Sequence, residues 1–157
     1  MEKYDRVAVV GVGNLLLRDE GIGVHVCHAL QELDLPDRVE TIDGGTSPEA
    51  LAYLEPADKL IIIDAVNAGG EPGTIYRFHP DDLMPENEGM TSLHELGLMS
   101  SLKMMSLMGN KHKEVVIIGV QPEEIDWGTE LTPGLQEKVP EIIKIVLKET
   151  GIDRYRR

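Results

Sequence analysis

The chain has 157 residues and carries 15 Lys and Arg against 28 Asp and Glu, a formal net charge of −13. This length matches one domain of roughly 100–200 residues, so we expect a single α/β domain over residues 1–157. No basic stripe interrupts the acidic balance, which disfavours binding to nucleic acid or to an anionic membrane surface. The longest purely apolar runs, such as 60–63, are far shorter than the roughly 20 residues that span a bilayer.

Cysteine content and the N-terminal segment indicate the compartment. Cys27 is the only cysteine, which excludes an internal disulfide and a CxxC or zinc-finger motif. Residues 1–6 carry charges of both signs and lack the apolar stretch of a signal peptide. We therefore expect a cytoplasmic protein with no membrane contact.

Three runs rich in β-branched residues, at 7–12, 60–63 and 115–120, predict strands that are buried on both faces, as in a parallel sheet covered by helices. Weaker strands are predicted at 39–42 and 74–78.

Apolar residues recur at helical spacing over 22–33 and 135–147, and a further helix is predicted at 91–108. Thr132 and Pro133 suit the N-cap and first position of the last helix, in which Pro140 should cause a kink or a restart. Together the elements predict an α/β fold: a three-layer sandwich whose mostly parallel, twisted sheet of about five strands has helices on both faces.

Acidic residues follow three of the predicted strands, where the carboxyl ends of parallel strands meet and ligands bind. Asp19 and Glu20 come after the first strand, Asp43 after the second, and Asp64 directly after the third. Helix capping is the alternative for Asp19 and Glu20, and a tight turn is the alternative for Asp43. Capping of the next turn is the alternative for Asp64, but an aspartate behind four aliphatic residues is close to buried and needs a partner.

A glycine pair after the first strand suggests a dinucleotide-binding loop, but the pattern is incomplete. Gly11 and Gly13 fit, whereas the third glycine position holds Leu16. Asp19 and Glu20 would also place negative charge where a phosphate must lie. The sequence therefore disfavours nucleotide binding.

His94 is the histidine whose position favours metal binding. Ser92 and Glu95 form a capping box that puts His94 in the first turn of the predicted helix, where the dipole favours the neutral imidazole. A capped surface histidine is the alternative. With Glu20 and Asp64, it completes a set of two carboxylates and one imidazole that suits zinc, nickel or manganese. Two carboxylates without a cation raise each other's proton affinity, so metal binding should weaken as pH falls.

Five motifs occur in order along about residues 10–135: Gly11-Val12-Gly13-Asn14 with Asp19-Glu20-Gly21-Ile22-Gly23, Asp43-Gly44-Gly45-Thr46, Ile63-Asp64-Ala65, Ser92-Leu93-His94-Glu95-Leu96-Gly97-Leu98, and Gly119-Val120-Gln121-Pro122. This series closely resembles the nickel-iron hydrogenase maturation endopeptidases. The resemblance implies a cytoplasmic enzyme that removes a short C-terminal extension from the hydrogenase large-subunit precursor once nickel has been inserted.

The resemblance also places the metal ligands of the family on Glu20, Asp64 and His94. We expect the ion to be nickel carried by the precursor, with other divalent ions substituting in vitro. The expected catalytic residues are Glu20, Asp64 and Asp43, with Asp43 or Asp19 managing protons while the metal polarises the carbonyl or activates water.

Alternatives to this chemistry and function stay open at this point. Water activation by two carboxylates, as in aspartic proteases, is a second chemical route. A nickel-binding chaperone module without peptidase activity is the alternative function. A covalent route is disfavoured because Cys27 falls in the middle of a predicted helix, where a thiol is packed and inert.

Overall fold

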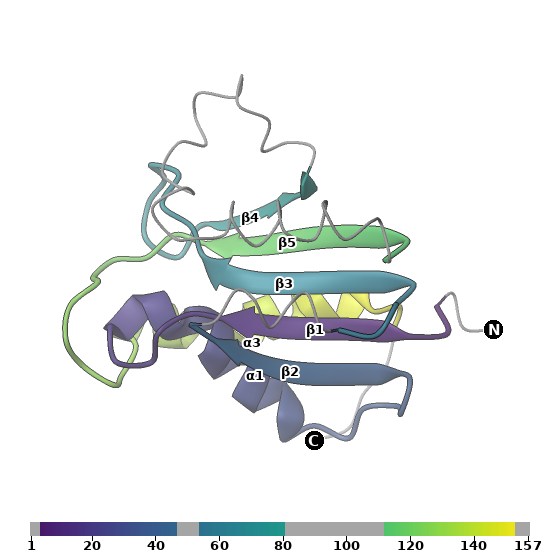
Figure 1. Cartoon of the computed structure of the whole chain (residues 1–157). Coiled ribbons are helices and arrows are strands. Elements are labelled where there is room, and N and C mark those ends of the chain that lie inside the picture. The colour runs from purple at the N-terminus through teal and green to yellow at the C-terminus, as the bar shows by residue number, and fades with distance from the viewer. Residues whose placement is uncertain (1–3, 47–53, 81–111, 153–157) are drawn as a thin grey trace.

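The computed structural model describes residues 4–46, 54–80 and 112–152, and all structural statements below concern these residues (Figure 1). The elements are, in chain order, β1 (Val7–Val12), the 3-10 helix η1 (Arg18–Gly21), α1 (Ile22–Gln31), β2 (Val39–Gly45), β3 (Lys59–Ala65), β4 (Ile75–Phe78), β5 (Glu114–Val120) and α3 (Pro133–Glu149). All five predicted strands are present, although β2 continues beyond its predicted end at 42. None of the described helices is long and apolar enough to cross a membrane.

The five strands form one sheet in the order β2-β1-β3-β5-β4. The β2, β1, β3 and β5 strands are mutually parallel, and β4 pairs antiparallel with β5 at the edge. The mostly parallel α/β fold predicted from the sequence is therefore confirmed. Because β1 has β2 on one side and β3 on the other, the carboxyl ends of β1 and β3 form the switch point at which open α/β sheets bind ligands.

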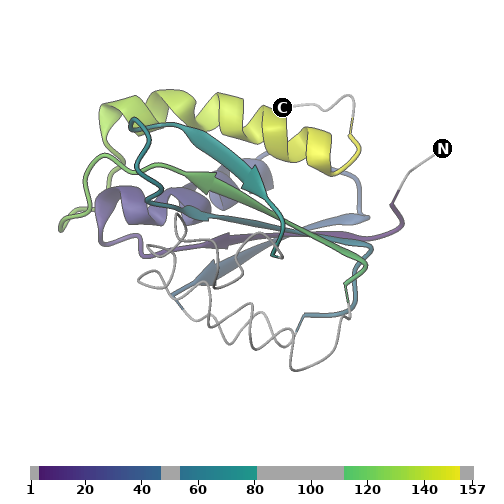
Figure 2. The same ribbon diagram turned by 90° about the horizontal axis from the view of Figure 1, so that it is seen from above.

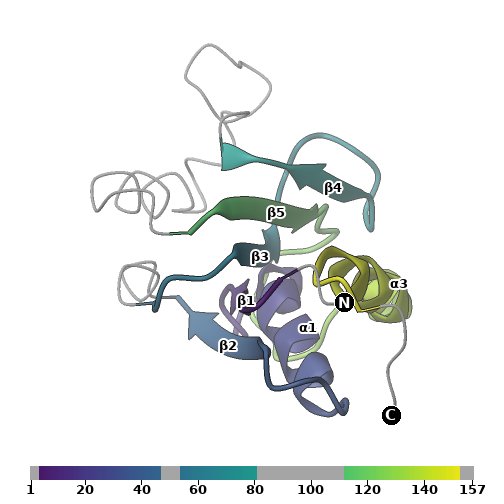
Figure 3. The same cartoon turned by 90° about the vertical axis from the view of Figure 1, so that its right-hand side faces the viewer.

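Both described α-helices cover the same face of the sheet (Figures 2 and 3). Alternate residues of β3 point to opposite faces, so Ile61 and Ile63 pack with α1 and α3 while Leu60 and Ile62 belong to the cluster on the other face. The helix predicted at 91–108 lies outside the described residues. A covering layer on the second face therefore stays a prediction.

The last helix begins as predicted, with Thr132 as its N-cap and Pro133 as its first residue. The expectation that the helix restarts at Pro140 is wrong, because α3 continues through this residue to Glu149. Pro140 is exposed, whereas Val139 and Ile142 beside it are buried against the sheet. Tertiary packing of the apolar face therefore sustains the helix despite the lost backbone hydrogen bond.

The glycines of the segment after β1 allow α1 and η1 to approach the sheet closely. A Cβ atom on Gly11 would lie 2.1 Å from the Gly23 carbonyl oxygen, and one on Gly23 would lie 2.1 Å from the Ile63 oxygen. Gly13 has a φ of +145°, and a Cβ atom there would lie 2.0 Å from the carbonyl oxygen of Glu20. These glycines therefore bring Glu20 to the end of β3.

Candidate active site

Asp64 supplies the buried carboxylate of the site. It lies near the carboxyl end of β3, is 2% exposed, and faces away from α1 and α3, as Ile62 does. Its Oδ1 accepts a hydrogen bond of 2.8 Å from the Ala65 amide, whereas its buried Oδ2 has no partner among the described residues. Burial raises the pKa of Asp64 well above its usual range, and the nearby Glu20 raises it further. The ionised form therefore needs a cation or a donor from elsewhere.

Glu20 is the second carboxylate, and the 3-10 helix η1 carries it to the end of β3. This helix contacts β3, and the Glu20 amide donates to the Leu17 carbonyl oxygen at 3.2 Å. The residue is half-buried, and burial raises the pKa of its carboxyl group. Glu20 and Asp64 thus lie close enough to interact, and we call them the carboxylate pair.

Asp19, next to Glu20, is fully buried and holds this part of the chain together. Its Oδ2 accepts hydrogen bonds from the amides of Glu123 at 2.9 Å and Glu124 at 3.1 Å, and its Oδ1 accepts one from the Thr132 amide at 2.8 Å. The Thr132 hydroxyl also donates to Oδ2 at 2.8 Å. Asp19 therefore fastens η1 to the start of α3, which fixes the position of Glu20.

These contacts revise the expected alternative for Asp19. Helix α1 has Gly21 as its N-cap and no side-chain capping hydrogen bond, so Asp19 does not cap the helix that follows it in sequence. Its carboxylate instead meets the N-terminus of α3, where a negative charge is also favourable. Because both oxygens already accept hydrogen bonds, the geometry assigns Asp19 to structure rather than to proton transfer.

Asp43 lies apart from the carboxylate pair. It is in register with Gly11 of β1, which is in register with Ile63 of β3, so a whole strand separates Asp43 from the end of β3. Its Oδ2 lies 2.9 Å from Nε2 of His28 on α1. Asp43 therefore faces the helix-covered side of the sheet, opposite to Asp64, and the described contacts do not bring it into the predicted catalytic set.

The loop after β5 is a part of the site region that sequence reasoning missed. Leu17 and Gly128 form an isolated parallel bridge, with hydrogen bonds of 3.0 Å from the Arg18 amide to the Gly128 oxygen and from the Gly128 amide to the Leu16 oxygen. Gly128 adopts a φ of +155°. A Trp-Gly step in an acidic, turn-like stretch was the available signal for an ordered loop.

The third predicted ligand, His94, lies outside the described residues. Within the part that the structure describes, no three His, Cys, Asp or Glu side chains are placed to hold a metal ion. The carboxylate pair offers oxygen donors, and the unpartnered Oδ2 of Asp64 fits a divalent cation that would neutralise both groups. The metal site formed by Glu20, Asp64 and His94 stays a prediction. The structure describes two of these residues, Glu20 and Asp64, and places them near one another.

The single cysteine does not offer a nucleophile. Cys27 is fully buried in α1, and burial raises the pKa of its thiol to about 11. A thiol in this state carries almost no thiolate at neutral pH. The prediction that Cys27 is packed within the first helix is confirmed, and its inertness stays a prediction.

The fold and the site define an α/β protein with paired carboxylates at the switch point of its sheet. The sequence model of the hydrogenase maturation protease family matches residues 24–149, and the chain belongs to this family. It is 38% identical to the hydrogenase expression/formation protein HupD of Bradyrhizobium diazoefficiens, over 98% of this chain and 83% of that one. It is 37% identical to the hydrogenase 2 maturation protease of Escherichia coli, over 97% and 96%.

Solved structures agree with this assignment. The hydrogenase maturating endopeptidase HybD of Escherichia coli superposes with a TM-score of 0.79 at 34% identity, covering 96% of both chains. A hydrogenase maturation protease HybD from Thermococcus kodakarensis superposes with a TM-score of 0.75 at 26% identity, covering 92% of this chain and 99% of that one.

Proposed function

We propose that this protein is an endopeptidase that removes the C-terminal extension from the nickel-loaded large-subunit precursor of a nickel-iron hydrogenase, acting in the cytoplasm. We further propose that nickel bound in the precursor is the recognition signal. Family membership supports the peptidase activity. The observation that carries the nickel proposal is the buried Oδ2 of Asp64, which lies beside Glu20 and has no partner among the described residues.

The proposed recognition of nickel rests on the missing counter-charge of the carboxylate pair within the described part of the chain. Two neighbouring carboxylates in a buried setting resist double ionisation, and a divalent cation relieves that penalty. Nickel held by precursor thiolates would gain oxygen ligands from Glu20 and Asp64 and a nitrogen ligand from His94, a donor mixture that nickel accepts. A precursor without nickel would leave the pair unsatisfied, and it would bind weakly.

Two cleavage chemistries use the same pair. In the first, the precursor's ion polarises the scissile carbonyl or activates water. In the second, the ionised member of the pair takes a proton from the attacking water while the protonated member donates one to the departing amide nitrogen. Burial raises the pKa of both Glu20 and Asp64, and the nearby Glu20 raises that of Asp64 further, which favours a proton shared between the two groups. Nickel binding should accordingly strengthen as pH rises through these values.

The test is to incubate the purified chain with nickel-loaded and with nickel-free precursor and to measure the precursor mass. We expect the C-terminal peptide to be lost only from the loaded form. Glu20→Gln should abolish this loss while circular dichroism stays unchanged, and Glu137→Gln on the exposed face of α3 is the matched control. Equal cleavage of both precursors would contradict nickel recognition. Nickel-dependent binding without cleavage would favour the nickel-chaperone alternative.

A further inference from the structure

Three large, exposed apolar residues lie on two segments that run beside the carboxylate pair. Among the described residues they are Leu16, Ile125 and Trp127, which are 54%, 47% and 76% exposed. They lie on the segment after β1 and on the loop after β5, at the same edge of the sheet (Figure 1). We call them the apolar patch. Exposed apolar side chains on two hydrogen-bonded segments offer apolar surface to a partner.

The patch is held in place by its backbone. The Leu16 carbonyl accepts from the Gly128 amide at 3.0 Å, which joins the two segments that carry the patch. The Trp127 amide donates to Asp126 Oδ1 at 2.7 Å. Exposure of Trp127 is therefore a property of an ordered loop, and binding through it costs little additional ordering.

The same backbone connects the patch to the carboxylate pair. The Glu20 amide donates to the Leu17 oxygen, one residue beyond Leu16. The Asp19 amide donates to the Glu124 oxygen at 3.2 Å, one residue before Ile125. A macromolecule that reaches Glu20 along this edge therefore meets the patch as part of one continuous surface.

Charge around the patch indicates the chemistry of the partner. Ile125 and Trp127 are interspersed with four exposed acids, at 123, 124, 126 and 130. Arg18 pairs with one of them, Glu124, at 3.4 Å, so the surface keeps an acidic excess. Its complement is an apolar contact bordered by Lys and Arg.

We propose that Leu16, Ile125 and Trp127 form the docking surface for the folded body of the hydrogenase large-subunit precursor, at a position of the precursor where apolar side chains are bordered by basic ones. This inference rests on the proposed function, because the precursor is the macromolecule that the site is proposed to take. The apolar patch binds the precursor, and the carboxylate pair then recognises nickel and cleaves the peptide.

Steady-state cleavage of nickel-loaded precursor tests the division of labour. Trp127→Ala should raise KM by about thirtyfold, the size of effect that a central tryptophan gives at interfaces, and leave kcat unchanged. Ile125→Ala should raise KM by severalfold. Ile145→Ala is the matched control, because it shortens an isoleucine that lines the cavity at the opposite edge of the sheet. Circular dichroism of each variant confirms folding.

The acidic border is tested separately by salt and by charge removal. Rising NaCl should lower kcat/KM of the wild-type chain, since screening weakens exposed charge pairs. Glu130→Gln should raise KM about twofold, whereas Glu137→Gln on α3 should not. A salt-independent kcat/KM would contradict the basic character of the partner surface.

The possible failures are distinguishable. If the wild-type chain cleaves the loaded precursor and Trp127→Ala has an unchanged KM, docking at the patch is wrong while the proposed function stands. If the wild-type chain does not cleave, direct binding of wild type and Trp127→Ala to the precursor decides: weaker binding of the variant supports docking, and equal or absent binding overturns it. Sedimentation in which Trp127→Ala turns a dimer into a monomer would assign the patch to a second copy of the chain and overturn the proposal.

Discussion

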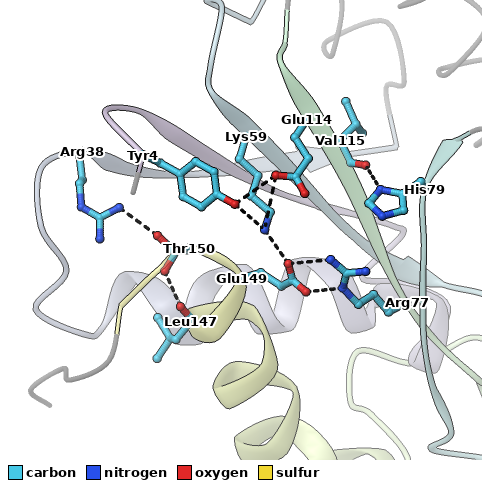
Figure 4. A network of polar contacts seen from close by, with 10 residues as sticks. All are labelled: Tyr4, Arg38, Lys59, Arg77, His79, Glu114, Val115, Leu147, Glu149 and Thr150. Carbon is cyan, nitrogen blue, oxygen red and sulfur yellow. Dashed lines mark hydrogen bonds and ion pairs between the residues drawn. The ribbon is translucent and has the colours of Figure 1, made fainter. Parts of the chain in front are cut away.

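Two buried charged groups lie near opposite ends of β3, and they differ in their hydrogen-bond partners. Lys59 begins the strand and is 4% exposed, and Asp64 near its other end is 2% exposed. Lys59 Nζ donates to Glu149 Oε2 at 2.6 Å and to the Tyr4 hydroxyl at 3.4 Å (Figure 4), whereas Asp64 Oδ2 has no partner in the described part of the chain. A buried polar group that is satisfied contributes to the fold, and one left unsatisfied at a ligand-binding edge indicates a functional site.

The amino edge of the sheet is closed by a network around Lys59. Glu149 also binds the Arg77 guanidinium, with Nη2 at 3.2 Å from Oε2, and the Tyr4 hydroxyl donates to Glu114 Oε2 at 3.1 Å. Burial opposes ionisation of Glu149, but Arg77 and Lys59 lower its pKa overall. The network ties the end of α3 to β3 and β4. One edge of the sheet therefore uses its charges for stability, whereas at the other edge Asp64 Oδ2 has no partner among the described residues and is proposed to meet a cation.

The largest expected effect is at Asp64. Asp64→Asn should lower the rate of precursor processing by more than about a hundredfold, since it removes a proposed ligand, and yet raise the free energy of unfolding at neutral pH. Mass measurement of the precursor and thermal unfolding check the two parts. Loss of stability at neutral pH would show that the Asp64 carboxylate is satisfied in the folded state.

The gain in stability should depend on pH with a definite sign. The folded-state pKa of Asp64 is raised, so wild type carries no penalty below about pH 4 and acquires one as pH rises toward the folded-state value. The advantage of Asp64→Asn should therefore vanish near pH 3 and grow toward neutrality, by about 1.4 kcal/mol for each pH unit between the unfolded-state and folded-state pKa values. Urea unfolding of both chains at several pH values measures it.

Removing the charge of Glu149 at the amino edge should lower stability and leave processing intact, the opposite of the result expected for Asp64→Asn. Glu149→Gln should cost roughly 2–3 kcal/mol of unfolding free energy, because it strips the buried Lys59 of its nearest counter-charge, and it should leave the kcat of processing unchanged. The folded-state pKa of Glu149 is lowered, so this cost should be present above about pH 4.5 and disappear as pH falls through the folded-state value. A pH-independent cost would contradict the ion-pair account.

Substitution of Asp19, which fastens η1 to the start of α3, should lower both the rate of processing and the free energy of unfolding, each by a smaller amount. Asp19→Asn replaces one acceptor oxygen with an NH2 donor that faces backbone amide donors, and it should cost about 2 kcal/mol of unfolding free energy. Processing should fall about tenfold because Glu20 loses its support. Thr132→Val removes only the hydroxyl donor and is the milder comparison, at about 1 kcal/mol. Full activity of Asp19→Asn would contradict the inference that the hydrogen bonds of Asp19 position Glu20.

The smallest effect is expected for Lys59→Met. Glu149 keeps Arg77 as a partner in this variant, and a methionine fills most of the volume of the lysine, so the change in unfolding free energy should stay below about 1 kcal/mol. Urea unfolding beside Glu149→Gln makes the comparison. A loss as large as that of Glu149→Gln would mean that Glu149 depends on Lys59 alone.

Much of the fold was predictable because its strands are short runs of buried aliphatic residues, such as Leu60 to Ile63 in β3. The position of Glu20 and Asp64 near one another also followed from the rule for parallel strand ends. The bonds of Asp19 could not be predicted, because its partners come from segments more than 100 residues away. The placement of Asp43 was available from alternation with the buried Val39 of β2, which puts both side chains on the face of α1.

The bond between Asp19 and the Thr132 amide spans 113 positions of sequence. During translation, the turn that bears Glu20 therefore gains its full set of anchoring hydrogen bonds only after the beginning of α3 has left the ribosome. A chain arrested before that point would contain the five described strands but lack the hydrogen bond between Asp19 and the Thr132 amide. The support that positions Glu20 is thus completed late in synthesis, after all five strands of the described sheet have been made.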